Sequence, residues 1–166
     1  MVSRILVPGL LLISALTLVG CGKMSPNDAI ASVNKTNVHR LANLYVRFQT
    51  EHRWAGPKDE EELRAYIDQL DPMVLERMGI DPTTTDDLFQ SEIDGEPFKI
   101  RYGVRGNARG SNEAVVFEST GKGGVRRVGF TSTKVEEVDD DARYQGLLDG
   151  SIREPLQPPQ APGPAA

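Results

Sequence analysis

The chain has 166 residues, of which 39% are hydrophobic and 26% are charged, and its formal net charge is -5. These proportions are those of an ordinary globular protein. The acidic balance argues against a general nucleic-acid binder, which needs a net basic surface. The single cysteine, Cys21, excludes an internal disulfide and therefore needs its own explanation.

The first twenty residues have the features of a secretory signal. Arg4 precedes an apolar stretch over residues 5–19. A membrane-spanning helix needs about 20 apolar residues, so this stretch is short for a span and typical of the apolar core of a signal peptide. Pro8 and Gly9 weaken it further as a permanent helix.

The end of this stretch, Leu18-Val19-Gly20-Cys21, resembles the bacterial lipobox, in which an aliphatic residue and small residues precede an obligatory cysteine. The resemblance implies cleavage after Gly20 and attachment of lipid to Cys21. We therefore expect a signal peptide over 1–20, a lipidated linker over 21–25 and a protein tethered to a membrane of the cell envelope. Gly22 in place of aspartate favours the outer membrane, facing the periplasm, where the organism has one. The alternatives are a secreted protein with a free cysteine or an uncleaved N-terminal helix.

The mature chain is predicted to form one domain over residues 26–150 that begins with helices. Ser25-Pro26 is a favourable start, and apolar residues recur every three or four positions from Ile30 to Phe48. This pattern predicts a long amphipathic helix to about residue 52. Shorter helices are expected from near Lys58 and after Asp71-Pro72, and residues 81–95 are expected to be mostly loop.

The second half of the domain has strand patterns. Phe98, Ile100, Tyr102 and Val104 alternate with polar residues, which predicts a strand with one apolar and one solvent-facing side. Further strands are expected over 114–118, 125–131 and 134–138, and a helical turn over 139–149. The fold class is therefore α+β, with the long helix across a small antiparallel sheet of three to four strands. The proline-rich residues 151–166 are predicted to be a disordered tail.

Several short motifs in this order are similar to the globular part of type II secretion pseudopilins, over roughly residues 30–140. They are Asn43-Leu44-Tyr45, Gly56-Pro57, Glu62-Leu63 and the turn into a strand at Asp94-Gly95-Glu96-Pro97-Phe98-Lys99-Ile100. The resemblance implies a helix packed on a small antiparallel sheet. The lipoprotein signal stands where that family has its filament-forming helix, so filament assembly is not carried over. Some members bind calcium in a C-terminal loop, and Asp139, Asp140 and Asp141 lie in about that place without a matching ligand pattern.

No motif for catalysis emerges, so we expect no enzymatic activity, no cofactor and no metal. His39 and His52 lie about 140° apart around one helix and cannot share a metal on it. The chain has no G-x-S-x-G motif, and Gly121-Lys122-Gly123-Gly124 lacks the remaining residues of a phosphate-binding loop. Paired carboxylates keep an envelope hydrolase as an alternative, although no particular pair is favoured.

Charge is distributed unevenly along the chain. Residues 59–96 contain thirteen acids and two arginines, a balance of -11, whereas residues 97–127 have a balance of +5. Lys99, Arg101 and Arg105 are predicted on the solvent face of the first strand, with Arg127 joining them from the third. The functional hypothesis is contact with an anionic partner, such as a phospholipid surface or an acidic protein segment. The alternative is pairing with the acidic helices.

The sequence thus predicts a membrane-tethered, non-catalytic interaction or structural module of the cell envelope. Its expected partners are the membrane, through the lipid anchor, and an envelope protein, with no nucleic acid. A pseudopilin-like accessory component of a secretion or pilus-type system is the first alternative, and an envelope hydrolase is the second.

Overall fold

A computed structural model describes residues 35–108 and 110–155. The helices are α2 (Asn37–Glu51), α3 (Glu60–Asp68), α4 (Pro72–Arg77), the 3-10 helix η1 (Thr85–Phe89) and α5 (Asp141–Asp149). The strands are β1 (Lys99–Ile100), β2 (Ala114–Phe117), β3 (Arg126–Phe130) and β4 (Val135–Val138), which pair antiparallel in the order β1-β2-β3-β4. These elements confirm an α+β fold with a small antiparallel sheet. Outside the described residues lie the signal peptide, Cys21, the linker, residues 26–34 of the predicted long helix and the tail from residue 156.

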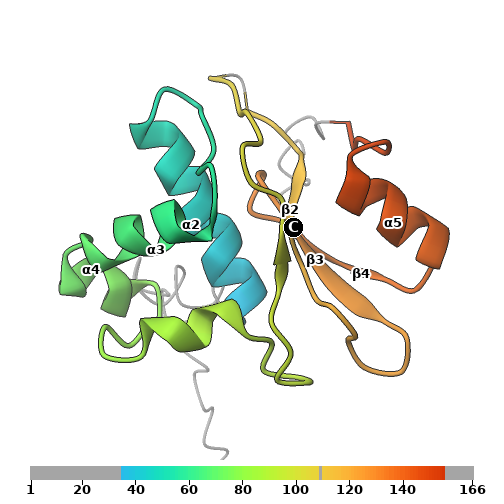
Figure 1. Cartoon of the computed structure of the whole chain (residues 1–166), viewed down its shortest axis with the longest axis horizontal. Coiled ribbons are helices and arrows are strands. Elements are labelled where there is room, and N and C mark those ends of the chain that lie inside the picture. Colours follow the sequence, from blue (N-terminus) through green and yellow to red (C-terminus); the bar gives the residue numbers. More distant parts are fainter. Residues whose placement is uncertain (1–34, 109, 156–166) are drawn as a thin grey trace, which may run out of the picture.

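The sheet lies between α2 on one side and α5 on the other (Figure 1). Gly129 of β3 faces α2, where an added Cβ would lie 3.0 Å from Val38 Cγ1 and 3.1 Å from Ala42 Cβ. Its neighbours Val128 and Phe130 belong to a separate apolar cluster that includes two residues of α5, Tyr144 and Leu147. The central strands β2 and β3 are therefore covered on both faces, whereas Lys99 of β1 is exposed, as predicted for the first strand. The continuous apolar sequence of β2, which is buried throughout, is typical of a strand covered on both faces.

Helix α2 is held at its N-terminal end by a loop distant in sequence. Its first backbone amide, of Asn37, donates to Glu92 Oε1 at 2.6 Å. The Asn37 side chain donates in turn to the carbonyls of Asp87 and Gln90, at 2.8 and 3.0 Å. The side chain of Thr36, at the capping position, makes no hydrogen bond to a backbone amide of the helix. A carboxylate from the loop after η1 thus satisfies the free end of α2 and complements its dipole.

The first strand is much shorter than the alternation over 98–104 predicts. The Tyr45 hydroxyl of α2 donates to the Arg101 carbonyl at 2.9 Å and accepts from the Val104 amide at 3.1 Å. The Gly103 amide donates to the Pro57 carbonyl at 2.7 Å, and Gly103 has a φ of +69°. The Arg101 amide still donates to the Val115 carbonyl of β2 at 2.9 Å. The Arg101 carbonyl and the backbone beyond it bind to α2 and to the loop that follows α2, so the ladder with β2 ends there.

Removal of the Tyr45 hydroxyl tests this anchoring. Tyr45 is fully buried, so Tyr45→Phe leaves the Arg101 carbonyl and the Val104 amide without a partner. We expect the free energy of unfolding to fall by about 1–3 kcal/mol in urea titrations. Tyr102→Phe is the matched control, because the buried Tyr102 hydroxyl makes no hydrogen bond within residues 35–108 and 110–155. A Tyr45 variant as stable as the Tyr102 variant would contradict the assignment.

Candidate functional site

A basic hollow of about 510 Å³ opens where the chain leaves β1. It is lined by Arg101, Tyr102, Gly103, Val104, Arg105, Glu113 and Arg153. Two of the four cations predicted for partner contact, Arg101 and Arg105, thus lie in one depression. Arg153 joins them from beyond α5, and the sequence analysis missed it because it assigns that residue to the tail. No local pattern links residue 153 to residues 101–105, so only the fold brings these side chains together.

The three arginines of the basic hollow differ in what holds them. Arg101 is largely buried, and its Nη1 donates to the carbonyls of Ala114 and Leu147 at 3.0 and 3.2 Å. It therefore ties the last turn of α5 to the sheet. Arg153 is 74% exposed and lies 3.8 Å from Glu113. Arg105 is exposed and makes no ion pair with any described residue. Arg105 and Arg153 are thus the cations that a partner can reach.

The other two predicted contact residues lie elsewhere. Lys99 Nζ lies 5.9 Å from the centre of the Tyr144 ring, on the α5 side of the sheet. Arg127 points to the opposite side, toward Glu92, so the prediction that it shares a face with Lys99 is wrong. Arg126, whose guanidinium lies 3.8 Å from the centre of the Tyr144 ring, is the arginine of β3 on the α5 side. A shift of one residue moves every side chain of a strand to the opposite face of the sheet. The register of β3 depends on its pairing with β2 and β4, which the sequence alone does not reveal.

Arg127 is the counterion of a buried carboxylate. Glu118, at 0% exposure, accepts from the Arg127 backbone amide at 2.8 Å and from Arg127 Nε and Nη2 at 2.8 and 2.5 Å. Ser91 Oγ donates to the same carboxylate at 3.2 Å. The predicted alternative for Arg127 was pairing with the acidic helices; its closest partner is instead Glu118 at the end of β2, and Glu92 of the acidic segment lies 3.8 Å away. The sequence analysis did not single out Glu118.

Two of the three aspartates considered for calcium, Asp140 and Asp141, have separate structural roles. Asp140 caps α5 by accepting from the Arg143 amide at 2.7 Å, and Asp141 pairs with Arg126. Within the part of the chain that the structure describes, no three histidine, cysteine or acidic side chains converge in a way that could hold a metal ion. The fold therefore does not assemble Asp139, Asp140 and Asp141 into a ligand set.

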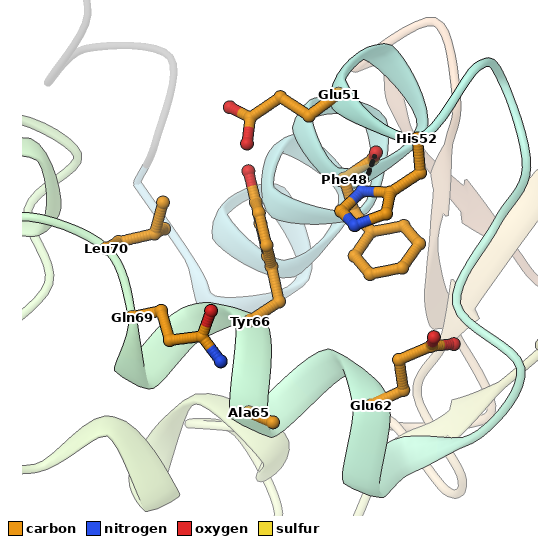
Figure 2. A pocket seen from close by; sticks show the side chains of 8 residues that line it. All are labelled: Phe48, Glu51, His52, Glu62, Ala65, Tyr66, Gln69 and Leu70. Atoms are coloured by element: carbon orange, nitrogen blue, oxygen red, sulfur yellow. Dashed lines mark hydrogen bonds between the residues drawn. The ribbon is translucent and has the colours of Figure 1, made fainter.

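A second depression, the aromatic cleft, lies between the end of α2 and α3 (Figure 2). It has a volume of about 340 Å³ and is lined by Phe48, Glu51, His52, Glu62, Ala65, Tyr66, Gln69 and Leu70. The His52 ring stacks on Phe48 at 3.9 Å, and its Nδ1 lies 2.8 Å from the Phe48 carbonyl. A carbonyl only accepts, so Nδ1 carries the proton and Nε2 is the free nitrogen of the neutral ring.

His39 lies near the other end of α2. Its Nδ1 lies 2.8 Å from Thr36 Oγ1. Burial, and then the positive charge of Arg127, hold the pKa of His39 below its usual value. His39 and His52 are roughly 20 Å apart along the helix axis, so each belongs to a different environment.

Comparisons with known proteins give no match: no protein-family model, no curated protein and no solved structure is significantly similar to this chain. None of the helices among residues 35–108 and 110–155 is both long and apolar enough to cross a membrane. The functional argument therefore depends on the residues themselves.

Neutralisation of Glu118 tests whether its ion pair supports the sheet between the two candidate sites. Glu118→Gln removes the closest counterion of the largely buried Arg127 and leaves it only Glu92, at 3.8 Å, so we expect a loss of about 3–5 kcal/mol in the free energy of unfolding. Glu137→Gln is the control, because Glu137 is exposed on the adjacent strand β4. Chemical denaturation of both variants gives the comparison, and equal stability of the two would refute a structural role for Glu118.

Proposed function

We propose that this protein is a membrane-tethered, non-catalytic interaction module of the cell envelope. The observation that carries the tether is the order Leu18-Val19-Gly20-Cys21 directly after an apolar stretch with a basic start. A cysteine that carries two or three acyl chains binds a bilayer firmly, whereas a single chain binds only marginally. Gly22 supports an outer-membrane position facing the periplasm in a cell with two membranes.

Cys21→Ser tests the tether. We expect the wild-type protein in the membrane fraction, with incorporation of labelled palmitate, and the variant in the soluble fraction without label. The hydroxyl of serine does not form the thioether that lipid attachment requires. Ser25→Ala, a change just beyond the cysteine, is the matched control and should leave fractionation unchanged. A Cys21 variant that stays with the membrane would mean that the N-terminal stretch itself holds the protein.

The basic hollow supports contact with an acidic segment of an envelope protein. Arg105 and Arg153 are exposed there, and Glu113 is the one carboxylate in its lining. The hollow lies beside Val104 and Gly106, whose amides bind Tyr45 and Trp54 near the C-terminal end of α2. That end is roughly 20 Å from Asn37, where the helix begins. The hollow is thus displaced from the side on which the chain enters the domain, which favours a partner other than the membrane to which Cys21 is anchored.

Charge reversal in the hollow tests this contact. We expect chemical crosslinking in intact cells to link the wild-type protein to a defined partner. In Arg105→Glu/Arg153→Glu the yield should fall at least tenfold, because like charges placed against an acidic segment cost several kcal/mol. Arg77→Glu/Lys122→Glu changes the net charge equally at exposed positions outside the hollow and should crosslink like wild type. Equal crosslinking of both double variants would rule the hollow out as the contact surface.

A pseudopilin-like accessory component is the second candidate. Supporting it, α2 packs on β2 and β3, and the Asp94-Gly95 turn leads toward β1. Asp94 accepts from the amides of Glu96 and Gly121, at 3.1 and 2.7 Å, so the turn also braces the loop between β2 and β3. The identity of the crosslinked partner decides between the candidates, because a subunit of a secretion or pilus-type system is expected only for the second.

A further inference from the structure

We propose that the aromatic cleft at the end of α2 is a binding site for an ammonium group on a short alkyl chain. The site is separate from the basic hollow, and the inference does not depend on the lipid anchor or on the proposed envelope partner. Its volume of about 340 Å³ lies within the range of small-ligand sites.

The charge of the lining favours a cation. Glu51 and Glu62 contribute two carboxylates, and the lining contains no lysine or arginine. Arg47 Nε lies 3.1 Å from Glu51 Oε1 and offsets one of these charges. Glu62 uses Oε2 to accept from the Lys58 amide at 2.6 Å. Glu51 and His52 also stand at the C-terminal end of α2, where the helix dipole attracts positive charge.

Three aromatic rings form the wall of the cleft. Tyr66 meets Phe48 edge-on at 5.2 Å and His52 edge-on at 5.9 Å, with interplanar angles of 82°. Figure 2 shows these rings between the carboxylates of Glu51 and Glu62. Aromatic faces attract ammonium groups electrostatically, and this attraction is strongest where water is partly excluded. The combination of rings with carboxylates therefore selects a cation that carries an apolar chain over a hydrated inorganic ion.

The Tyr66 hydroxyl lies at the Glu51 side of the cleft. Tyr66 is only 9% exposed, and its hydroxyl is close to the side chains of Glu51 and Arg47. In Figure 2 the hydroxyl is directed toward the Glu51 carboxylate from the cleft wall. Burial, and then the nearby charge of Glu51, raise the pKa of Tyr66 to about 12, so the group is neutral at physiological pH. The hydroxyl thus helps to position the Glu51 carboxylate at the cleft.

The backbone beside the cleft is held in a strained form. Arg53 and Trp54 directly follow His52 and have φ values of 55° and 67°. Two consecutive non-glycine residues in this region are uncommon, and each costs of the order of 1 kcal/mol or more. The Trp54 amide donates to the Gln49 carbonyl at 2.7 Å, which turns the chain sharply away from α2 after His52.

Calorimetric titration of the full-length protein with cadaverine tests the proposal. We expect saturable binding of cadaverine and none of 1-pentanol, which has the same chain length without the charge. Glu51→Gln/Glu62→Gln should weaken cadaverine binding at least tenfold, and Tyr66→Phe should weaken it several-fold. Glu61→Gln, an exposed neighbour on α3 outside the lining, should bind like wild type. Thermal unfolding of each variant shows whether the fold is intact.

A second arm identifies the source of the ammonium group. A short peptide with one lysine is titrated beside cadaverine; tighter binding of the peptide assigns the site to a protein side chain, and tighter binding of cadaverine assigns it to a free amine. Both results support an ammonium site. Absence of cadaverine and peptide binding at millimolar concentration would overturn it, as would equal binding of cadaverine by wild type and by Glu51→Gln/Glu62→Gln.

Discussion

The buried ion pair between Glu118 and Arg127 is the constraint on which the arrangement of this domain depends. A charged carboxylate at 0% exposure is stable only when its lone pairs are occupied, and here Arg127 and Ser91 occupy them. The backbone carbonyl of Glu118 accepts a hydrogen bond from the Tyr144 hydroxyl at 2.7 Å. One residue thus joins β2 to β3, to the loop after η1 and, across the sheet, to α5.

Both candidate sites lie beside the C-terminal half of α2. The Tyr45 hydroxyl holds the backbone after β1, and Arg101 holds the last turn of α5. Hydrogen bonds therefore fix the backbone around the basic hollow. The aromatic cleft lies past the same helix end, against α3. The two depressions have opposite charge: arginines dominate the hollow, and carboxylates with aromatic rings line the cleft.

Much of the fold could be predicted, because its elements carry local signals. The stripe of α2, the Asp71-Pro72 start of α4 and three of the four strands lie close to their predicted positions. The first strand was predicted too long, because alternation of side chains does not reveal where the backbone finds other partners. The prediction that Arg127 shares a face with Lys99 was wrong for a related reason. The face on which a side chain lies depends on the register of its strand, and the register depends on the partner strand.

The sequence by itself determined the anchor prediction, the fold class and the order of the elements, since each depends on residues adjacent along the chain. Only the tertiary structure decided the candidate sites. Arg153 reaches Arg101 and Arg105 because α5 folds over the sheet, and Tyr66 reaches Phe48 and His52 because α3 turns back against α2. The contacts that make the sites are set by burial and pairing between distant segments. Cys21 needs only its neighbours to be identified, whereas the cleft and the hollow exist only once the chain has folded.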